Sequence, residues 1–124
     1  MNLVDSCGWL EYFDDGPNAG FFAKPLEQTA RLVVPTICVY EVFRRLLSQV
    51  GRGPALEAVA AMRQAHVVPL TDALAMQAAA LGAQLKMSMA DSIVLATAHA
   101  HQATVWTQDA HFSKIPGVNF KTKS

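Results

Sequence analysis

The stretch from Lys86 to Phe112, KMSMADSIVLATAHAHQATVWTQDAHF, combines the patterns of a buried helix, a buried strand and two carboxylates. Ser88 and Asp91 have the S-x-x-D spacing of a helix N-terminus, and the apolar run that follows predicts a helix covered on several sides. Residues 103–106 predict a short buried strand, and Asp109 follows where that strand should stop. The pattern therefore predicts Asp91 in the first turn of a helix and Asp109 at the end of a strand.

The rest of the chain alternates short apolar strands with helices. Strands are predicted at 2–4, 32–34, 67–70, 103–106 and 118–120, and helices at 6–13, 18–29, 36–50, 55–65, 72–85 and from Ser88 to near Gln102, with Ser6 and Thr36 as further N-caps. This alternation predicts an α/β fold with a mainly parallel central sheet, right-handed crossovers and flanking helices. At 124 residues, we expect a single domain that spans residues 1–124.

Composition limits the partners of the chain. Charged residues make up 16% of the sequence against 52% hydrophobic residues, and the ten basic and ten acidic residues cancel. Because no overall positive field attracts nucleic acid, a polyanionic substrate would have to be held by a local patch or by a metal ion.

The cysteine pattern and the hydropathy both predict a cytoplasmic protein. Cys7 and Cys38 lack C-x-x-C or Cys/His spacing, so we expect reduced, buried thiols, with a disulfide between them as the alternative. No uninterrupted apolar stretch reaches the roughly 20 residues of a membrane span, and the N-terminus lacks a signal-peptide pattern. We therefore expect no membrane association.

Four acids are predicted along the edge of the sheet that is formed by the C-terminal ends of the parallel strands. Asp5 and Asp109 leave the ends of strands, while Glu41 and Asp91 lie in early turns of helices that start at the same edge. Carboxylates gathered there would repel one another unless a cation neutralised them. The hard cations Mg²⁺ and Mn²⁺ take oxygen ligands, and metal-dependent nucleases use them to cleave phosphodiesters.

Each acid also has a purely structural interpretation. Asp91 can be the third residue of a capping box, and Glu41 can pair with Arg44 or Arg45 one turn later on the helix. Asp5 and Asp109 can be turn formers or N-caps. These interpretations leave unexplained why acids from segments spread along the chain are all assigned to one edge.

Four motifs carry a family resemblance. They are VDSCGWL at 4–10, Glu41 within VPTICVYEVFRRL at 34–46, MADSI at 89–93 and WTQDAHF at 106–112. In this order they resemble the successive motifs of PIN domains, and specifically those of the VapC toxins of bacterial toxin–antitoxin pairs. The resemblance covers essentially the whole chain.

The resemblance implies a Mg²⁺- or Mn²⁺-dependent endoribonuclease that forms a homodimer and is inhibited by a cognate VapB-type antitoxin. By position it assigns the catalytic cluster to Asp5, Glu41, Asp91 and Asp109, with Asp5, Asp91 and Asp109 as metal ligands. Thr107 would orient a ligand or water through its hydroxyl, and no organic cofactor is implied.

One departure from the family pattern concerns residue 111. Many relatives carry an acid two residues after the last motif aspartate, where this chain has His111. His66, His99, His101 and His111 otherwise suggest surface or core packing rather than metal ligation.

Some functional assignments stay open from the sequence. Arg44, Arg45 and Lys86 could contact a scissile phosphate or form a solvated surface. Trp9, Phe13 and the helix at 39–50 could belong to the core or form a dimer or antitoxin surface. Two other functions also fit an α/β fold with acids at strand ends: a phosphoacceptor domain and a catalytically silent interaction module.

Overall fold

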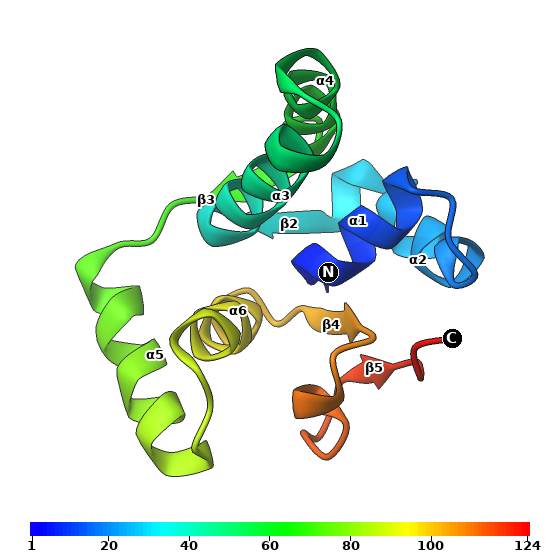
Figure 1. The fold of residues 1–124 in the computed structure, drawn as a ribbon. Helices are drawn as coiled ribbons and strands as arrows, with labels where there is room; N and C mark the ends of the chain where they lie inside the picture. The colour runs from blue at the N-terminus through cyan, green and yellow to red at the C-terminus, as the bar shows by residue number, and fades with distance from the viewer.

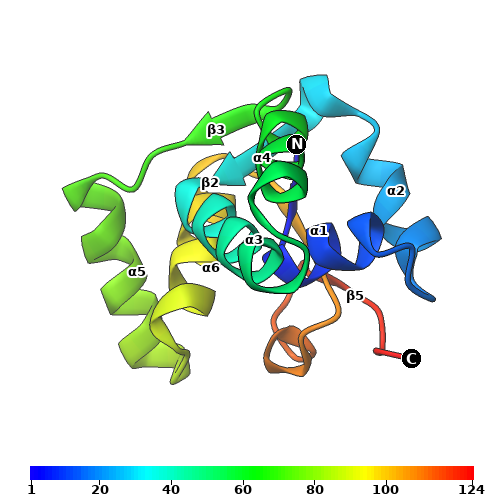
Figure 2. The ribbon, with the colours of Figure 1, turned by 45° about the horizontal axis from the view of Figure 1, so that its top comes forward.

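The five strands form one parallel sheet in the order β3-β2-β1-β4-β5. The computed structural model describes residues 1–124. The strands are β1 (Asn2–Val4), β2 (Leu32–Pro35), β3 (His66–Val68), β4 (Thr104–Thr107) and β5 (Asn119–Phe120). Figure 2 shows β2 and β3 side by side at one edge of the sheet, and β5 forms the other edge, as the sequence predicted.

The first strand lies at the centre of the sheet. β1 pairs in parallel with β2 and with β4, so that Leu3 lies between Val33 and Val105. These three side chains are at most 2% exposed. Such continuous burial is typical of parallel strands with both faces covered by helices, and it explains why β1 and β2 lack an alternating pattern.

Six α-helices flank the sheet as three pairs of consecutive helices (Figure 1). Their bounds are α1 (Ser6–Phe13), α2 (Ala19–Leu26), α3 (Thr36–Gln49), α4 (Arg52–Met62), α5 (Asp72–Leu85) and α6 (Met89–Ala100). Two short 3₁₀ helices, η1 (Thr29–Arg31) and η2 (Ala110–Phe112), complete the chain. No helix is both long enough and apolar enough to span a bilayer.

Several helix starts differ from the prediction for local reasons. Asp5, rather than Ser6, is the N-cap of α1, because its carboxylate accepts a hydrogen bond from Ser6 N at 2.8 Å. Pro35 precedes α3, and Thr36 is the first helical residue rather than a side-chain cap. Ser88 caps α6 as predicted, since its Oγ accepts from Asp91 N at 3.3 Å.

Other element boundaries also shift. α2 ends at Leu26 rather than Thr29, with Pro25 in its last turn, because proline has no N–H to continue the helix. α4 begins at Arg52, directly after Gly51, whose φ of 97° permits the sharp turn out of α3. The third strand lies one to two residues earlier than predicted, at His66–Val68, whereas α5 has the predicted bounds.

The core lies on both faces of the sheet. Its largest fully buried side chains include Phe22, Phe112, Leu3, Met62 and Leu95. In α6 every residue from Ser92 to Ala98 is buried, as the all-apolar pattern predicted. Trp9 is 3% exposed and belongs to this core.

A polar contact fixes the loop after β4 to the C-terminal segment. The side-chain amide of Asn18 donates to Gln108 Oε1 at 2.9 Å and to Thr122 O at 3.1 Å. Asn18 and Gln108 are both buried, so these hydrogen bonds hold three distant segments together.

Candidate functional site

Asp5 and Asp109 follow the two adjacent strands β1 and β4. Val4 pairs with Trp106, and Asp5 N donates to Trp106 O at 3.0 Å. This register places Asp5 beside Thr107, the last residue of β4, two residues before Asp109. The predicted meeting of strand ends therefore occurs at this edge of the sheet.

The Thr107 hydroxyl connects these two acids. Its Oγ1 donates to Asp5 Oδ2 at 3.0 Å and accepts from Asp109 N at 2.9 Å. Cys7 lies against the same atoms, with Sγ 3.3 Å from Thr107 Oγ1 and 3.6 Å from Asp5 Oδ2. Because the hydroxyl proton is directed at Asp5, Thr107 orients a carboxylate within the chain.

Asp91 and Asp109 form a group with His111. His111 Nδ1 lies 3.0 Å from Asp109 Oδ1 and 3.5 Å from Asp91 Oδ2. One potential ligand atom from each residue lies within 4.8 Å of the other two. Asp91 comes from the first turn of α6, and Asp109 follows β4 as the N-cap of η2. The group therefore joins the helix and the strand end of the stretch from Lys86 to Phe112.

Glu41 belongs to a second group, with Asp5 and Cys38. The potential ligand atoms of these three residues also lie within 4.8 Å of one another. Ser6 Oγ donates to Glu41 Oε1 at 3.0 Å, which fixes the carboxylate. No ion pair joins Glu41 to Arg44 or Arg45, since Arg44 Nη1 instead donates to Tyr40 OH at 2.9 Å.

Burial and mutual repulsion disfavour ionisation in this region. Burial raises the pKa of Asp5 from its ordinary value of 3.8 to about 6, Asp91 and Glu41 add to the rise, and hydrogen bonds from Thr107 and Ser6 oppose it. The pKa of Asp91 is also raised, first by burial and then by the charge of Asp109. The two groups are therefore electrostatically coupled.

The chain supplies little positive charge of its own to this cluster. No Lys or Arg nitrogen lies within 4.0 Å of any carboxylate oxygen in the protein, and the only ion-pair partner is His111. Several carboxylates that lack a Lys or Arg partner, with Asp5 nearly fully buried, form a donor set that fits a hard divalent cation.

Both thiols near the cluster are free and protonated. Burial, and then the charge of Asp5, raise the pKa of Cys7 to about 12 and that of Cys38 well above its ordinary value. A thiol in this state is a poor nucleophile at neutral pH. The expected reduced cysteines are confirmed, and no disulfide joins them; Cys38 is buried as predicted, whereas Cys7 is only partly buried.

The structure also shows what the sequence analysis missed. The four predicted acids and Thr107 lie at one sheet edge, but they are divided between two groups. The contacts of His111, Cys7 and Cys38 with these acids were not foreseen. The sequence did contain one indication that Cys38 lies near Glu41. The two residues are three positions apart on one predicted helix, and such residues share a face.

A family model described as PIN domain matches residues 3–118, and the chain therefore belongs to the PIN domain family. The predicted single PIN-like α/β domain is confirmed. A search of curated proteins found no match.

Solved structures with the same fold include toxin–antitoxin proteins. A toxin–antitoxin complex from Klebsiella pneumoniae has 21% identity and a TM-score of 0.81, over 95% of each chain. Mycobacterium tuberculosis VapC20, described as a sarcin-ricin loop cleaving toxin, has 19% identity and a TM-score of 0.80, over 96% of this chain and 98% of that chain. DNA-bound VapBC from Salmonella typhimurium has 15% identity and a TM-score of 0.74, over 98% of each chain. These likenesses establish the fold.

Proposed function

We propose that this chain is a divalent-metal-dependent endoribonuclease and the toxin of a type II toxin–antitoxin pair, active in the cytoplasm. The observation that carries the proposal is the gathering of Asp5, Glu41, Asp91 and Asp109 at one edge of the sheet without a Lys or Arg partner. Membership of the PIN family and the toxin–antitoxin structures of the same fold support it.

Asp5, Asp91 and Asp109 would hold Mg²⁺ or Mn²⁺, with Glu41 completing the cluster. When bound, such an ion stabilises negative charge on a phosphate and lowers the pKa of a coordinated water. The hydrogen bonds of Thr107 fix Asp5 and Asp109 relative to each other, so that the chain itself keeps two ligands in position.

Glu41 would act on the attacking water. Ser6 occupies its Oε1, whereas its Oε2 makes no hydrogen bond within the protein and would accept a proton from that water. The water oxygen would then form a bond to phosphorus in line, the bond to the 3′ oxygen would break, and that oxygen would take a proton from solvent. The 5′ phosphate would stay on the downstream fragment.

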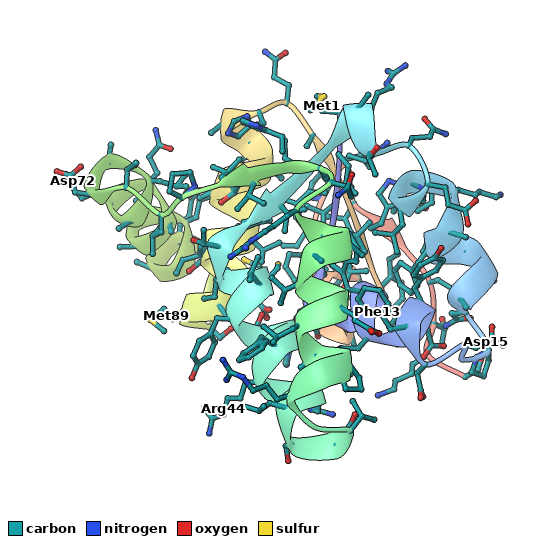
Figure 3. The ribbon with its side chains drawn as sticks, turned by 90° about the horizontal axis from the view of Figure 1, so that it is seen from above. Met1, Phe13, Asp15, Arg44, Asp72 and Met89 are labelled. Carbon is teal, nitrogen blue, oxygen red and sulfur yellow. The ribbon has the colours of Figure 1, made fainter.

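Exposed basic residues would contact the RNA backbone. Arg44, Arg45 and Lys86 are exposed and make no ion pair, so their charge remains available to phosphates. Arg44 extends away from α3 into solvent (Figure 3). The neutral composition means that this local charge, together with the metal, would replace an overall positive field.

The proposed antitoxin would bind beside the site. A cavity of about 710 Å³ is lined by residues of α1, α3 and α4 and reaches the site at Cys7 and Gln108. Its wall combines the apolar Leu46 and Val50 with the charged Arg45, a surface suited to an amphipathic protein segment. The Klebsiella pneumoniae relative was solved as a toxin–antitoxin complex, which supports a protein inhibitor. We also propose a homodimer, which sedimentation analysis of the isolated chain would test.

RNA cleavage by amide variants tests the function. Asp91→Asn and Asp5→Asn keep the side-chain shape and remove a charge, and we expect each to lower the rate of RNA cleavage at least about 100-fold. Asp15→Asn is the matched control, because Asp15 is exposed in a turn with φ of 52°, which asparagine tolerates.

Two results would contradict the proposal. Cleavage that persists at the wild-type rate in both Asp91→Asn and Asp5→Asn would show that the acidic cluster is not the catalytic centre. No cleavage by the wild type, together with no Mn²⁺ binding in calorimetry, would favour the catalytically silent interaction module.

A further inference from the structure

The backbone of η2 orients His111 toward two aspartates. Asp109 N-caps this short helix, and its Oδ1 accepts a hydrogen bond from His111 N at 2.9 Å. The His111 side chain then turns back, so that its Nδ1 lies 3.0 Å from the same oxygen and 3.5 Å from Asp91 Oδ2. One imidazole nitrogen and two carboxylates therefore converge from η2, β4 and α6.

The spacing of these three atoms resembles that of ligands around one ion. Two ligands bound at about 2.1 Å and at right angles are about 3 Å apart, close to both nitrogen–oxygen distances here. The His111 side chain is 80% exposed, whereas those of Asp109 and Asp91 are 28% and 13% exposed. The group is thus open on the histidine side, where an ion from solvent can enter.

We infer that His111 is a nitrogen ligand of the ion held by Asp91 and Asp109, and that it makes this site prefer Mn²⁺ over Mg²⁺. The inference rests on the proposed metal site and specifies which ion that site takes. Both ions bind oxygen well, but Mg²⁺ retains its waters and strict octahedral oxygen coordination, whereas the transition-metal ion Mn²⁺ accepts an imidazole nitrogen more readily than Mg²⁺ does.

The lack of a negative charge at residue 111 also favours Mn²⁺ over Mg²⁺. An aspartate at this position would bring three negative charges to the group, whereas with His111 the group has two. Less negative charge weakens the electrostatic attraction for either ion, so a nitrogen donor favours the ion that binds nitrogen more strongly.

The alternative is that His111 is only an ion-pair partner of Asp91 and Asp109. In that arrangement an imidazolium occupies the place of the cation, and an entering metal ion displaces the side chain. The two arrangements differ in one observable: only a ligand His111 shows magnetic coupling of its nitrogen to bound Mn²⁺.

Electron spin-echo spectroscopy of the Mn²⁺-loaded full chain tests this directly. We expect the wild type to show an imidazole ¹⁴N coupling that His111→Asn abolishes. His99→Asn is the matched control and keeps the coupling, because His99 is exposed on α6 and contacts none of the acids. No ¹⁴N coupling in the wild type, or coupling that survives His111→Asn, overturns the inference.

Calorimetry with Mn²⁺ alone and Mg²⁺ alone supplies the second measurement. We expect His111→Asp to reduce the ratio of Mn²⁺ to Mg²⁺ affinity by roughly tenfold or more. An unchanged ratio overturns the stated preference. Mn²⁺ binding without ¹⁴N coupling refutes only the role of His111, whereas no Mn²⁺ binding by the wild type refutes the proposed metal site as well.

Discussion

The buried carboxylate of Asp5 should make the metal-free protein less stable at neutral pH than at acidic pH. Its pKa is about 6 in the folded chain against an ordinary value of 3.8. Between these values the folded chain binds more protons than the unfolded chain, so stability falls as pH rises through this window. Each pKa unit corresponds to about 1.4 kcal/mol, and the full loss above pH 6 is therefore about 3 kcal/mol.

Asp5→Asn removes this charge and retains an oxygen acceptor for Ser6 N, while its NH₂ group replaces the oxygen that accepts from Thr107 Oγ1. In the presence of EDTA at pH 7.5, we expect the variant to be more stable than the wild type by up to about 3 kcal/mol. At pH 4 the difference should fall below about 1 kcal/mol, because the wild-type carboxyl is then protonated in the fold. Urea denaturation followed by circular dichroism at both pH values measures the two differences.

Added Mn²⁺ should make the wild type more stable than Asp5→Asn. A ligand present at 100 times its dissociation constant stabilises the fold by about 2.7 kcal/mol, and Asp5→Asn weakens the site that would bind it. A stability difference between the wild type and Asp5→Asn in EDTA that is the same at pH 4 and pH 7.5 would refute the reasoning, because it would mean that ionising this buried carboxyl costs nothing.

Further variants test how the chain supports the cluster and its core. Thr107→Val leaves Asp5 Oδ2 and Asp109 N without their partner, so we expect a loss of about 1–3 kcal/mol in urea denaturation, and Thr107→Ser should restore most of it. An added Cβ at Gly8 would lie 2.5 Å from Val4 Cγ1, so Gly8→Ala should cost about 1–3 kcal/mol in the same assay. At Gly20 no atom lies within 4 Å of an added Cβ, and Gly20→Ala should be neutral or stabilise by up to about 1 kcal/mol.

Much of the fold could be predicted because local patterns and tertiary packing agree. The Ser88 cap and the apolar run after it identified α6, and the bounds of α5 were predicted correctly. The errors concern element ends, as in α2 and β3, and helix starts. At α1, two neighbouring polar residues compete to be the cap. Asp5 and Ser6 could each cap α1, and only the backbone geometry selects Asp5.

The candidate site was less completely predictable. Topology brought the acids to one edge, because parallel strand ends and helix starts meet there. The division into two groups depends on side-chain directions that spacing does not determine. His111 was grouped with the other histidines as a surface or core residue, because it stands where the family resemblance leads one to expect an acid. Its neighbours Asp91 and Asp109 are instead brought to it by the cap of η2.

The central position of β1 has a consequence for biosynthesis. Thr107 is 102 positions from Asp5, and β1 can pair with β4 only after the residues between them have been made. A nascent chain still lacking β4 on the ribosome has Asp5 but neither Thr107 nor Asp109 beside it. For a chain proposed to cut RNA, the arrangement delays catalytic competence until β4 and Asp109 have been synthesised and have left the ribosome.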